Sequence, residues 1–349
     1  MAKPIVALLY DFDKTLSTTD MQEYDFIKNL DMEPSEFWGE CGKLKNEHGM
    51  DGILSYMYVM VDMCKKKGIK LTREYLNKCG KSIVLYNGVR TWFERINKYG
   101  EELGVTVEHY IISSGITEII EGCEIAKYFK AIYGCSFLYN NDNEAIWPAV
   151  AINFTQKTQY IFRVSKGVLD IRDDHNLNRA TSKQERRIPY ENMIYIGDGI
   201  TDIPCMTLIR EKGGRAVAIY PPQTNTPAAK QLAKEGRINF VTAANYADDS
   251  TLTKTIKLYI ESIAVTTNLK EKYNAEVIYD SFETPKNVNK WVYDKTFKLI
   301  PNLIIMEPVD YNESRDTGER LGSHLSFVTT RDGTLEWLIN HSLSQCPNE

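Results

Sequence analysis

Short apolar runs that stop abruptly at polar residues are the feature that most restricts how this chain can fold. Residues 5–10 read Ile-Val-Ala-Leu-Leu-Tyr and end at Asp11, a pattern typical of a strand buried on both faces of a parallel sheet. Helices are expected between this strand and the later ones. Further strands are predicted at residues 105–112, 193–196, 215–220 and 239–242. Strands that alternate with helices predict an α/β fold, in which helices cover both faces of a parallel sheet.

Two segments depart from this alternation. Residues 19–100 carry apolar side chains at helical spacing with no convincing strand, so we expect a helical insertion, too large for a loop, that forms a cap. Residues 131–139 and 145–153 flank the polar turn Asn-Asn-Asp-Asn and predict a hairpin, followed by a helix at 155–170. Residues 171–190 are polar and charged, which predicts a surface excursion with solvated arginines.

The predicted organisation has three parts. An α/β core is formed by residues 1–18 and 101–264, the cap by residues 19–100, and a C-terminal α+β extension by residues 265–349. The extension alternates between strand and helix patterns and contains no motif that indicates catalysis or binding, so its role stays open. With 349 residues, 43% of them hydrophobic, the chain is long enough for a full core and an added domain.

Charge and cysteine content restrict partners and location. There are 47 acidic and 42 basic residues, with no basic stripe that would neutralise a nucleic-acid backbone, so no nucleic-acid partner is expected. The seven cysteines are scattered without CxxC pairs, which argues against a disulfide framework and a structural zinc site. No apolar run approaches the ~18 residues of a membrane span. We expect a soluble, cytoplasmic protein without a membrane partner, and its oligomeric state stays open.

Acidic residues cluster where predicted strands end. Asp11 and Asp13 follow the first strand, and Asp198 follows a later one. Ligands of open parallel sheets bind at the carboxyl ends of the strands, so these side chains are expected to converge. Two carboxylates two residues apart repel each other unless a cation or a shared proton compensates, and a hard dication is the simplest compensation. Mg²⁺ is therefore the predicted cofactor, with Asp198 able to supply a further oxygen.

A set of motifs in fixed order resembles the haloacid dehalogenase (HAD) superfamily over roughly residues 5–245. The matching residues are Asp11-Phe12-Asp13-Lys14-Thr15, Ser113, Lys157 and Gly197-Asp198 with Asp202. The inserted helical cap and the segment Ser113-Ser114-Gly115 are most similar to the phosphoserine-phosphatase-like branch. The resemblance implies a Rossmann-like, HAD-like core with a helical C1-type cap. It also implies a Mg²⁺-dependent phosphatase that hydrolyses a small phosphorylated metabolite, a phosphomonoester.

The resemblance also implies a role for each matching residue. Asp11 becomes the nucleophile that forms an aspartyl-phosphate, and Asp13 the general acid and base. Asp11, Asp13 through its carbonyl, and Asp198 would hold Mg²⁺, while Asp202 would orient metal-bound waters or Lys157. The phosphate-binding set implied by the resemblance is Thr15, Ser113, Ser114, Gly115 and Lys157.

Several alternatives stay open. Lys166 and Lys183 compete with Lys157, which is favoured because it lies in the first turn of its predicted helix. Asp20 stands where phosphoserine phosphatases carry an acid that faces the substrate amine, which mildly favours an amino-bearing substrate. A solvated aspartate on the cap is the alternative interpretation of Asp20, and it is the favoured one. The arginine that those enzymes use for the substrate carboxylate has no counterpart, since Asp51 falls near its place. A phosphomutase or phosphotransferase with the same intermediate, and a catalytically silent phosphoryl-ligand-binding module, are the rival functions.

Overall fold

A seven-stranded sheet forms the centre of the protein, for which a computed structural model describes residues 3–222 and 227–276. The strand order is β4-β3-β2-β1-β5-β6-β7, and every neighbouring pair is parallel except the antiparallel pair β3 and β4. The strands are β1 Ile5–Tyr10, β2 Thr106–Ile116, β3 Phe129–Tyr139, β4 Ala145–Val150, β5 Met193–Gly197, β6 Arg215–Tyr220 and β7 Phe240–Ala243. The predicted α/β class with a Rossmann-like parallel sheet is confirmed.

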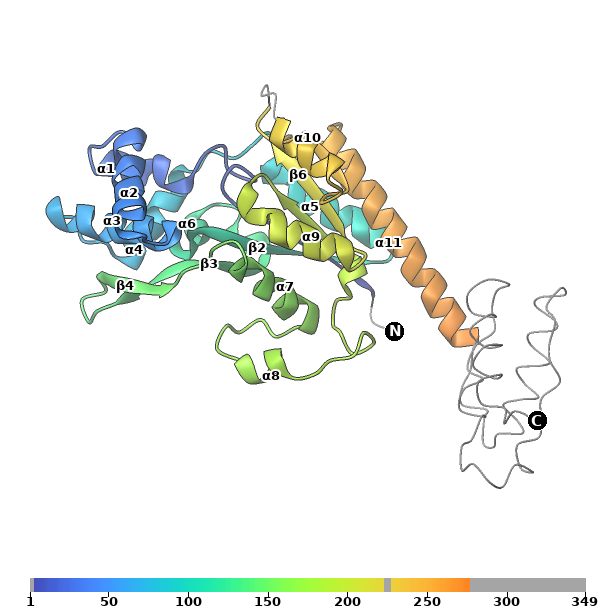
Figure 1. Ribbon diagram of the computed structural model, residues 1–349. Helices are drawn as coiled ribbons and strands as arrows, with labels where there is room; N and C mark the ends of the chain where they lie inside the picture. The colour runs from blue at the N-terminus through green and yellow to red at the C-terminus, as the bar shows by residue number, and fades with distance from the viewer. Residues whose placement is uncertain (1–2, 223–226, 277–349) are drawn as a thin grey trace, which may run out of the picture. The chain divides into compact units, whose positions relative to one another are not determined.

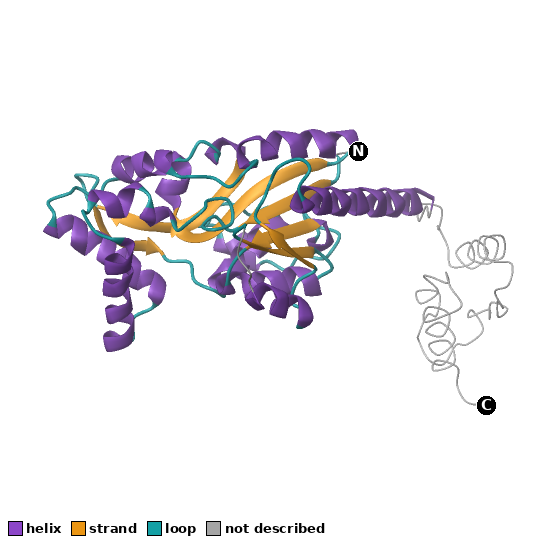
Figure 2. Cartoon of the chain, turned by 90° about the horizontal axis from the view of Figure 1, so that it is seen from above, coloured by secondary structure: helices purple, strands orange, loops and turns teal. Residues whose placement is uncertain are grey.

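Helices cover both faces of this sheet (Figure 2). They are α1 Asp25–Asn29, α2 Pro34–His48, α3 Gly52–Lys66, α4 Arg73–Cys79, α5 Val89–Glu102, α6 Thr117–Gly122, α7 Gln156–Lys166, α8 Asp174–Asn178, α9 Ile203–Glu211, α10 Pro227–Lys234 and α11 Thr251–Glu276. Figure 1 shows α7 and α9 together in front of the sheet, and α5 behind it. In the described part of the chain, no helix is both long and apolar enough to cross a membrane.

The order of the strands reverses direction at β1. Strands β2, β3 and β4 follow one another on one side of β1, and the chain then crosses over so that β5 pairs with the other side of β1. Tyr10, the last residue of β1, lies opposite Ile111 of β2 and Ile196 of β5. The loops that follow β1 and β5 therefore leave the sheet at the same level, whereas β2 continues alongside them to Ile116. Such a switch point is where open α/β sheets form their ligand-binding crevice.

The helical insertion predicted at residues 19–100 contains one helix that packs as part of the core. Trp92 of α5 donates a hydrogen bond of 2.8 Å from its indole nitrogen to the hydroxyl of Tyr10 in β1. The ring of Phe93 lies 5.0 Å from that of His109 in β2. Helices α1–α4 make up the rest of the insertion, and two antiparallel linkers joined at Ser17 and Leu85 connect it to the sheet.

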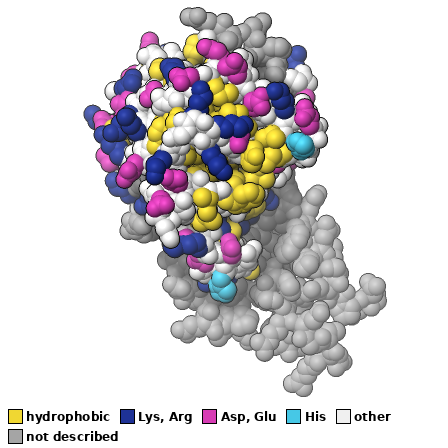
Figure 3. Space-filling model, turned by 90° about the vertical axis from the view of Figure 1, so that its left-hand side faces the viewer, with side chains coloured by type: hydrophobic (Ala, Val, Ile, Leu, Met, Phe, Trp, Pro, Cys, Tyr) yellow, Lys and Arg dark blue, Asp and Glu magenta, His cyan; other side chains and the backbone are white. Residues whose placement is uncertain are grey.

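The predicted hairpin is confirmed as β3 and β4, with the second strand ending at Val150 instead of residue 153. It lies beside the cap helices at the left of Figure 1, and β4 packs against α3. Its cross-strand pair Leu138 and Trp147 is exposed. Hydrophobic and charged side chains are mixed on this face of the molecule (Figure 3).

Strand β2 extends further than predicted. It continues through the segment Ser113-Ser114-Gly115 to Ile116, with a register shift against β3 between Ile112 and Ile116. The backbone stays extended because β3 runs alongside and pairs again at Cys135. A bulge of this kind re-aims side chains beside a site. The segment after residue 112, where the predicted strand ends, is therefore an irregular part of β2.

The predicted helix at 155–170 ends earlier, and the excursion at 171–190 is not merely solvated. Helix α7 stops at Lys166 because Gly167 adopts the left-handed conformation, with φ 75°. Buried Arg163 donates hydrogen bonds to the carbonyls of Asp170 and Ile171 at 2.8 and 2.9 Å. Arg187 donates two hydrogen bonds, of 2.6 and 2.7 Å, to the carboxylate of Glu108 in β2. The expectation of solvated arginines in this segment is therefore wrong for Arg187.

The chain divides into two compact units, Met1–Asn268 and Leu269–Glu349. The predicted start of the C-terminal extension, residue 265, falls within α11, which runs without a break from Thr251 to Glu276. The extension elements predicted beyond residue 276 lie outside the described residues.

Candidate active site

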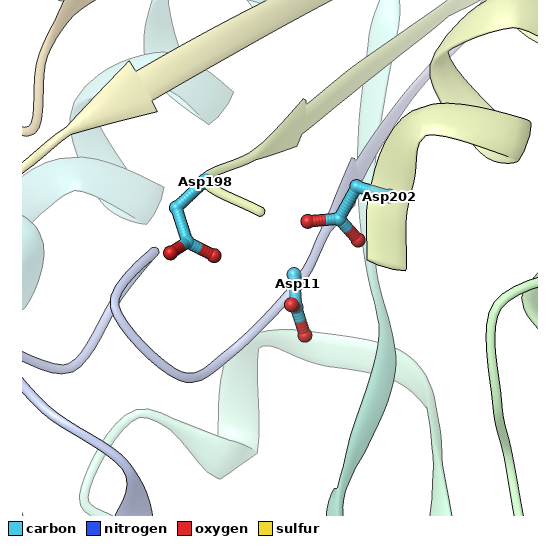
Figure 4. Close-up of side chains that lie close together, drawn as sticks. All are labelled: Asp11, Asp198 and Asp202. Carbon is cyan, nitrogen blue, oxygen red and sulfur yellow. The ribbon is translucent and has the colours of Figure 1, made fainter. Parts of the chain in front are cut away.

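Three carboxylates meet where β1 and β5 end. The backbone N–H of Asp11 donates a 3.0 Å hydrogen bond to the carbonyl of Ile196, so the pairing of β1 with β5 continues into the site. Asp198 directly follows β5, and Asp202 precedes α9. One oxygen from each of Asp11, Asp198 and Asp202 lies within 4.8 Å of the other two. Figure 4 shows the three side chains converging from these separate segments.

Lys157 links two of these carboxylates. Its Nζ lies 3.0 Å from Oδ2 of Asp11 and 2.8 Å from Oδ1 of Asp202, and its side chain is fully buried. Burial would lower the pKa of Lys157, but Asp11 and Asp202 reverse this effect and raise it, so the ammonium keeps its charge. Of the competing lysines, Lys166 donates to two carbonyls of the 171–190 segment, and Lys183 is exposed. The structure therefore brings Lys157 to Asp11.

Asp202 is held by more partners than the sequence indicates. Its Oδ1 also accepts a 2.7 Å hydrogen bond from the hydroxyl of Tyr195, and its Oδ2 accepts from the N–H of Gly199 at 3.3 Å. A Cβ at position 197 would lie 2.4 Å from Oδ2 of Asp202, so only glycine fits there. The sequence analysis missed Tyr195, whose signal would have been a hydroxyl inside an otherwise apolar strand.

The electrostatics of the site favour a bound cation. Burial, reinforced by Asp202 and opposed by Lys157, raises the pKa of Asp11 to about 6. Burial, reinforced by Asp11 and Asp202, raises the pKa of Asp198 to about 8. A dication between these oxygens would remove the repulsion that disfavours their charged forms. Because the donors are hard carboxylate oxygens, the set fits Mg²⁺ better than a thiolate-seeking metal.

Asp13 lies at the opposite side of the loop, toward β2. Its Oδ1 accepts a 2.8 Å hydrogen bond from the backbone N–H of Met21. Its Oδ2 is only 3.0 Å from where a Cβ at Gly115 would lie, and that Cβ would also collide with Met21 at 2.0 Å. Burial raises the pKa of Asp13 well above its usual range, with Asp20 and Asp11 adding to the effect. A carboxyl group in this setting can hold a proton near neutral pH.

The hydroxyl groups of the predicted phosphate-binding set have unused hydrogen-bonding capacity. Among the residues that the structure describes, Thr15 Oγ1 and Ser114 Oγ are buried without any partner. Ser113 Oγ accepts from the N–H of Gly115 at 3.0 Å, which leaves its own O–H free to donate. Buried polar atoms without partners are uncommon in proteins, and a bound ligand is one explanation for them.

Asp20 already has a partner. The Nζ of Lys14 lies 2.6 Å from its Oδ2, and this interaction is the main cause of a raised pKa at Lys14, where burial acts in the opposite direction. Lys14 adopts φ 54°, which is uncommon for a residue with a side chain and tends to occur at functional sites. Asp20 is therefore paired with Lys14 through Oδ2. Lys14 escaped the sequence analysis as a candidate because it occupies the position between two motif residues.

Asp51, which falls near the place of the missing arginine, caps a helix. Its Oδ1 accepts from the N–H groups of Ile53 and Leu54 at 2.9 and 3.1 Å, at the start of α3. Its Oδ2 accepts from Asn153 at 3.2 Å. These contacts account for an acid at this position without a substrate.

Tyr86 is a further residue that the sequence analysis did not single out. It lies on the linker that returns from the cap, and its N–H donates to the carbonyl of Leu16 at 3.0 Å. Its hydroxyl is buried, and no described residue forms a hydrogen bond with it. Burial raises the pKa of Tyr86 to about 12, and the charge of Asp198 adds to the shift.

Comparisons with known proteins show similarity to one curated protein and to several solved structures. No protein-family model matches the chain. A curated protein of Borreliella burgdorferi, described as uncharacterized, is 26% identical over 282 residues, which cover 73% of this chain and 94% of that protein.

The similar solved structures include a HAD family hydrolase from Salmonella enterica serovar Typhi, 16% identical, covering 68% of this chain and 67% of that chain with a TM-score of 0.47. A probable phosphoserine phosphatase from Vibrio cholerae is 14% identical, covering 77% and 67% with a TM-score of 0.48. These names are those of the superfamily and branch that the motifs resemble.

Proposed function

We propose that this chain is a HAD-type, Mg²⁺-dependent phosphatase that hydrolyses a small phosphomonoester through an aspartyl-phosphate on Asp11. One observation supports this most strongly. The Asp11 carboxylate stands at the switch point of the sheet, 3.0 Å from the ammonium of Lys157 and close to Asp198. Phosphoryl transfer depends mainly on positioning and on neutralising charge, and this arrangement offers both.

In the proposed reaction, a carboxylate oxygen of Asp11 attacks phosphorus, and the bond from phosphorus to the leaving oxygen breaks. Asp13 gives its proton to the departing alcohol. Water then attacks the phosphorus of the aspartyl-phosphate and passes a proton to Asp13, and inorganic phosphate leaves while the Asp11 carboxylate is restored. Lys157 stays charged throughout and stabilises the negative charge shared by Asp11 and the phosphoryl group.

Mg²⁺ would be held by the carboxylates of Asp11 and Asp198 and by the backbone carbonyl of Asp13, and would neutralise charge on the phosphoryl oxygens. Asp202 has a different part in this proposal. It accepts hydrogen bonds from Lys157 and Tyr195 and so positions the ammonium. Thr15, Ser113 and Ser114 would donate their free hydroxyls to the substrate phosphate.

The proposed substrate is a small phosphorylated metabolite, and the proposed location is the cytoplasm, without nucleic-acid or membrane partners. The ion pair between Lys14 and Asp20 makes recognition of a substrate amine by Asp20 unfavourable, because that carboxylate is already neutralised. Phosphoserine is therefore a poorer fit than phosphomonoesters without an amino group.

The test is turnover of p-nitrophenyl phosphate with Mg²⁺. Asp11→Asn should abolish release of phosphate, since an amide cannot act as the nucleophile, and Asp13→Asn should lower kcat by about 10²–10⁴-fold. The control is Asp142→Asn, in the exposed turn of the hairpin, which should leave turnover unchanged. Phosphate release by Asp11→Asn at the wild-type rate would disprove the proposal.

Product analysis distinguishes the rival functions. A phosphomutase or phosphotransferase would move the phosphoryl group to an organic acceptor instead of to water. A silent binding module would bind Mg²⁺ and phosphate analogues without turnover of any ester.

A further inference from the structure

A hollow outside the site at Asp11 lies between α4, α6 and the β3–β4 hairpin. It has a volume of about 230 Å³, smaller than the roughly 300–1,000 Å³ of pockets for drug-sized ligands. Its lining combines apolar side chains with ionisable groups. The apolar part includes Ile132, Val150, Tyr160 and Ile171, and the ionisable groups are Arg73, Glu118 and Glu121. A small cavity of this composition suits a small molecule with an apolar end and a charged end.

Glu118 is the most unusual of these groups. Only 3% of the residue is exposed. Its Oε1 accepts hydrogen bonds from Arg73 at 3.3 Å and from the hydroxyl of Tyr139 at 2.7 Å. Its Oε2 is buried, and no residue in the described part of the chain donates to it. An unsatisfied buried carboxylate oxygen is costly, so this atom has the chemistry of a binding group that awaits a donor.

The carboxylate of Glu121 adds a second negative charge to the same hollow. Glu121 lies three residues further along α6 and lines the same hollow. Burial raises the pKa of Glu121, and the charge of Glu118 adds to the effect. An ammonium group placed between the two carboxylates would relieve this repulsion and donate to the free Oε2.

Arg73 provides the opposite charge at the same end of the hollow. Its guanidinium stacks on the ring of Tyr139, 4.0 Å from the centroid, and its side chain is more than half exposed. Its Nη1 donates to Oε1 of Glu118, the one hydrogen bond of the guanidinium found within the described residues. A guanidinium has five N–H donors in a fork that suits a carboxylate, so most of its capacity is free.

A neighbouring hollow of about 400 Å³ shares Arg73, Glu118 and Glu121 and is also lined by Lys78 and Lys81. The charged residues of the first hollow therefore also face this second hollow beside α4, where Lys78 and Lys81 add positive charge. A plain amine would use only the glutamates, and a plain carboxylate only Arg73. A zwitterion uses both sets of charges.

We propose that this hollow binds a free apolar amino acid. Its ammonium would lie between Glu118 and Glu121, its carboxylate on Arg73, and its side chain against Val150, Tyr160 and Ile171. Because Arg73 lies on α4 of the cap and Glu118 on α6 of the core, the ligand would contact both parts of the same compact unit. The site is separate from Asp11, so it does not depend on the proposed phosphatase activity.

The test is calorimetric titration of the full-length protein with L-leucine and L-phenylalanine at millimolar concentration. Leucine should bind with one site per chain. Isoamylamine, which lacks the carboxylate, and 4-methylpentanoate, which lacks the ammonium, should each bind at least about tenfold more weakly, because each leaves a charged partner unpaired. L-serine should also bind more weakly, since it leaves the apolar wall unfilled. Absence of binding by both apolar amino acids would overturn the proposal.

Variants place the binding in this hollow. Glu118→Gln should weaken leucine binding by about tenfold or more, and Val150→Phe, which fills the apolar part, should do the same without changing a charge. Glu40→Gln is the matched control, a glutamate paired with Lys43 on α2 at 2.6 Å, and should bind leucine normally. Asp11→Asn should also bind leucine normally. If leucine binding survives in both hollow variants, or is lost in Asp11→Asn, the proposed site is wrong.

Discussion

At the scale of single residues, Lys157 supplies the positive charge that faces both Asp11 and Asp202. It is fully buried and paired with two carboxylates that are themselves almost or fully buried. A buried ammonium without partners would lose its proton, but here the partners raise its pKa. The same partners would be left uncompensated if the lysine were removed, so the residue is needed for stability as well as for the proposed chemistry.

Replacing this lysine should therefore cost much stability. We expect Lys157→Met to lower the free energy of unfolding by about 3–5 kcal/mol, measured by urea denaturation without divalent cations, because Asp11 and Asp202 lose their counter-charge. Lys166→Met on the same helix is the control. Lys166 only donates to two surface carbonyls, and its loss should cost well under half as much. Equal losses in the two variants would show that the Lys157 pairs do not stabilise the fold.

At the scale of elements, a chain of hydrogen bonds joins α5 to the two central strands. Trp92 donates to the hydroxyl of Tyr10, which in turn lies 2.9 Å from Nδ1 of His109. The other ring nitrogen, Nε2, lies 2.9 Å from Oδ1 of Asn97. Because the amide oxygen only accepts, Nε2 carries the proton and Nδ1 accepts from Tyr10. This packing explains why α5 belongs to the core although its sequence pattern continues that of the cap.

The same network makes stability depend on pH. Burial lowers the pKa of His109 to about 3, whereas its value in the unfolded chain is about 6.5. Between these values the unfolded chain binds a proton that the folded chain does not, so stability rises with pH in that window. We expect wild type to lose roughly 2 kcal/mol more than His109→Gln between pH 6.5 and pH 5, as measured by urea denaturation. His48→Gln, at the exposed end of α2, should behave as wild type; an identical pH slope for His109→Gln would contradict the prediction.

At the scale of the whole molecule, the site exists because β1 lies between strands from two separate parts of the chain. Asp11 and Asp198 are far apart in sequence, and the pairing of β1 with β5 brings their carboxylates together. Burial is the main cause of the raised pKa of both groups, with Asp202 adding to the effect on Asp11, and Asp11 and Asp202 adding to it on Asp198. A ligand that supplies positive charge should therefore stabilise the folded state as a whole.

Mg²⁺ should accordingly raise the melting temperature. At a Mg²⁺ concentration about 100-fold above Kd, the free energy of unfolding should rise by about 2.7 kcal/mol. This corresponds to a rise of roughly 5–10 °C in the melting temperature, measured by calorimetry. Asp198→Asn should abolish the shift, while the metal-free variant should melt no lower than metal-free wild type because one repulsive charge is gone. A wild-type melting temperature that does not respond to Mg²⁺ would remove the metal from the proposal.

Local patterns in the sequence are sufficient to predict the strands, their parallel pairing and the meeting of Asp11 and Asp198. Buried strands are continuous apolar runs, and the polar residues at their ends must emerge along one edge of the sheet. The hairpin turn was equally visible, since its polar residues separate two apolar runs.

Individual side-chain contacts lie beyond such patterns. The pairing of Lys14 with Asp20, the hydroxyl of Tyr195 on Asp202, and the unpaired oxygen of Glu118 all depend on how side chains pack in three dimensions. The packing of α5 is a further example, because its sequence shows the helical period but not the strand against which the helix packs. Periodicity records which face of an element is buried, whereas the identity of the neighbour is set by the folded chain.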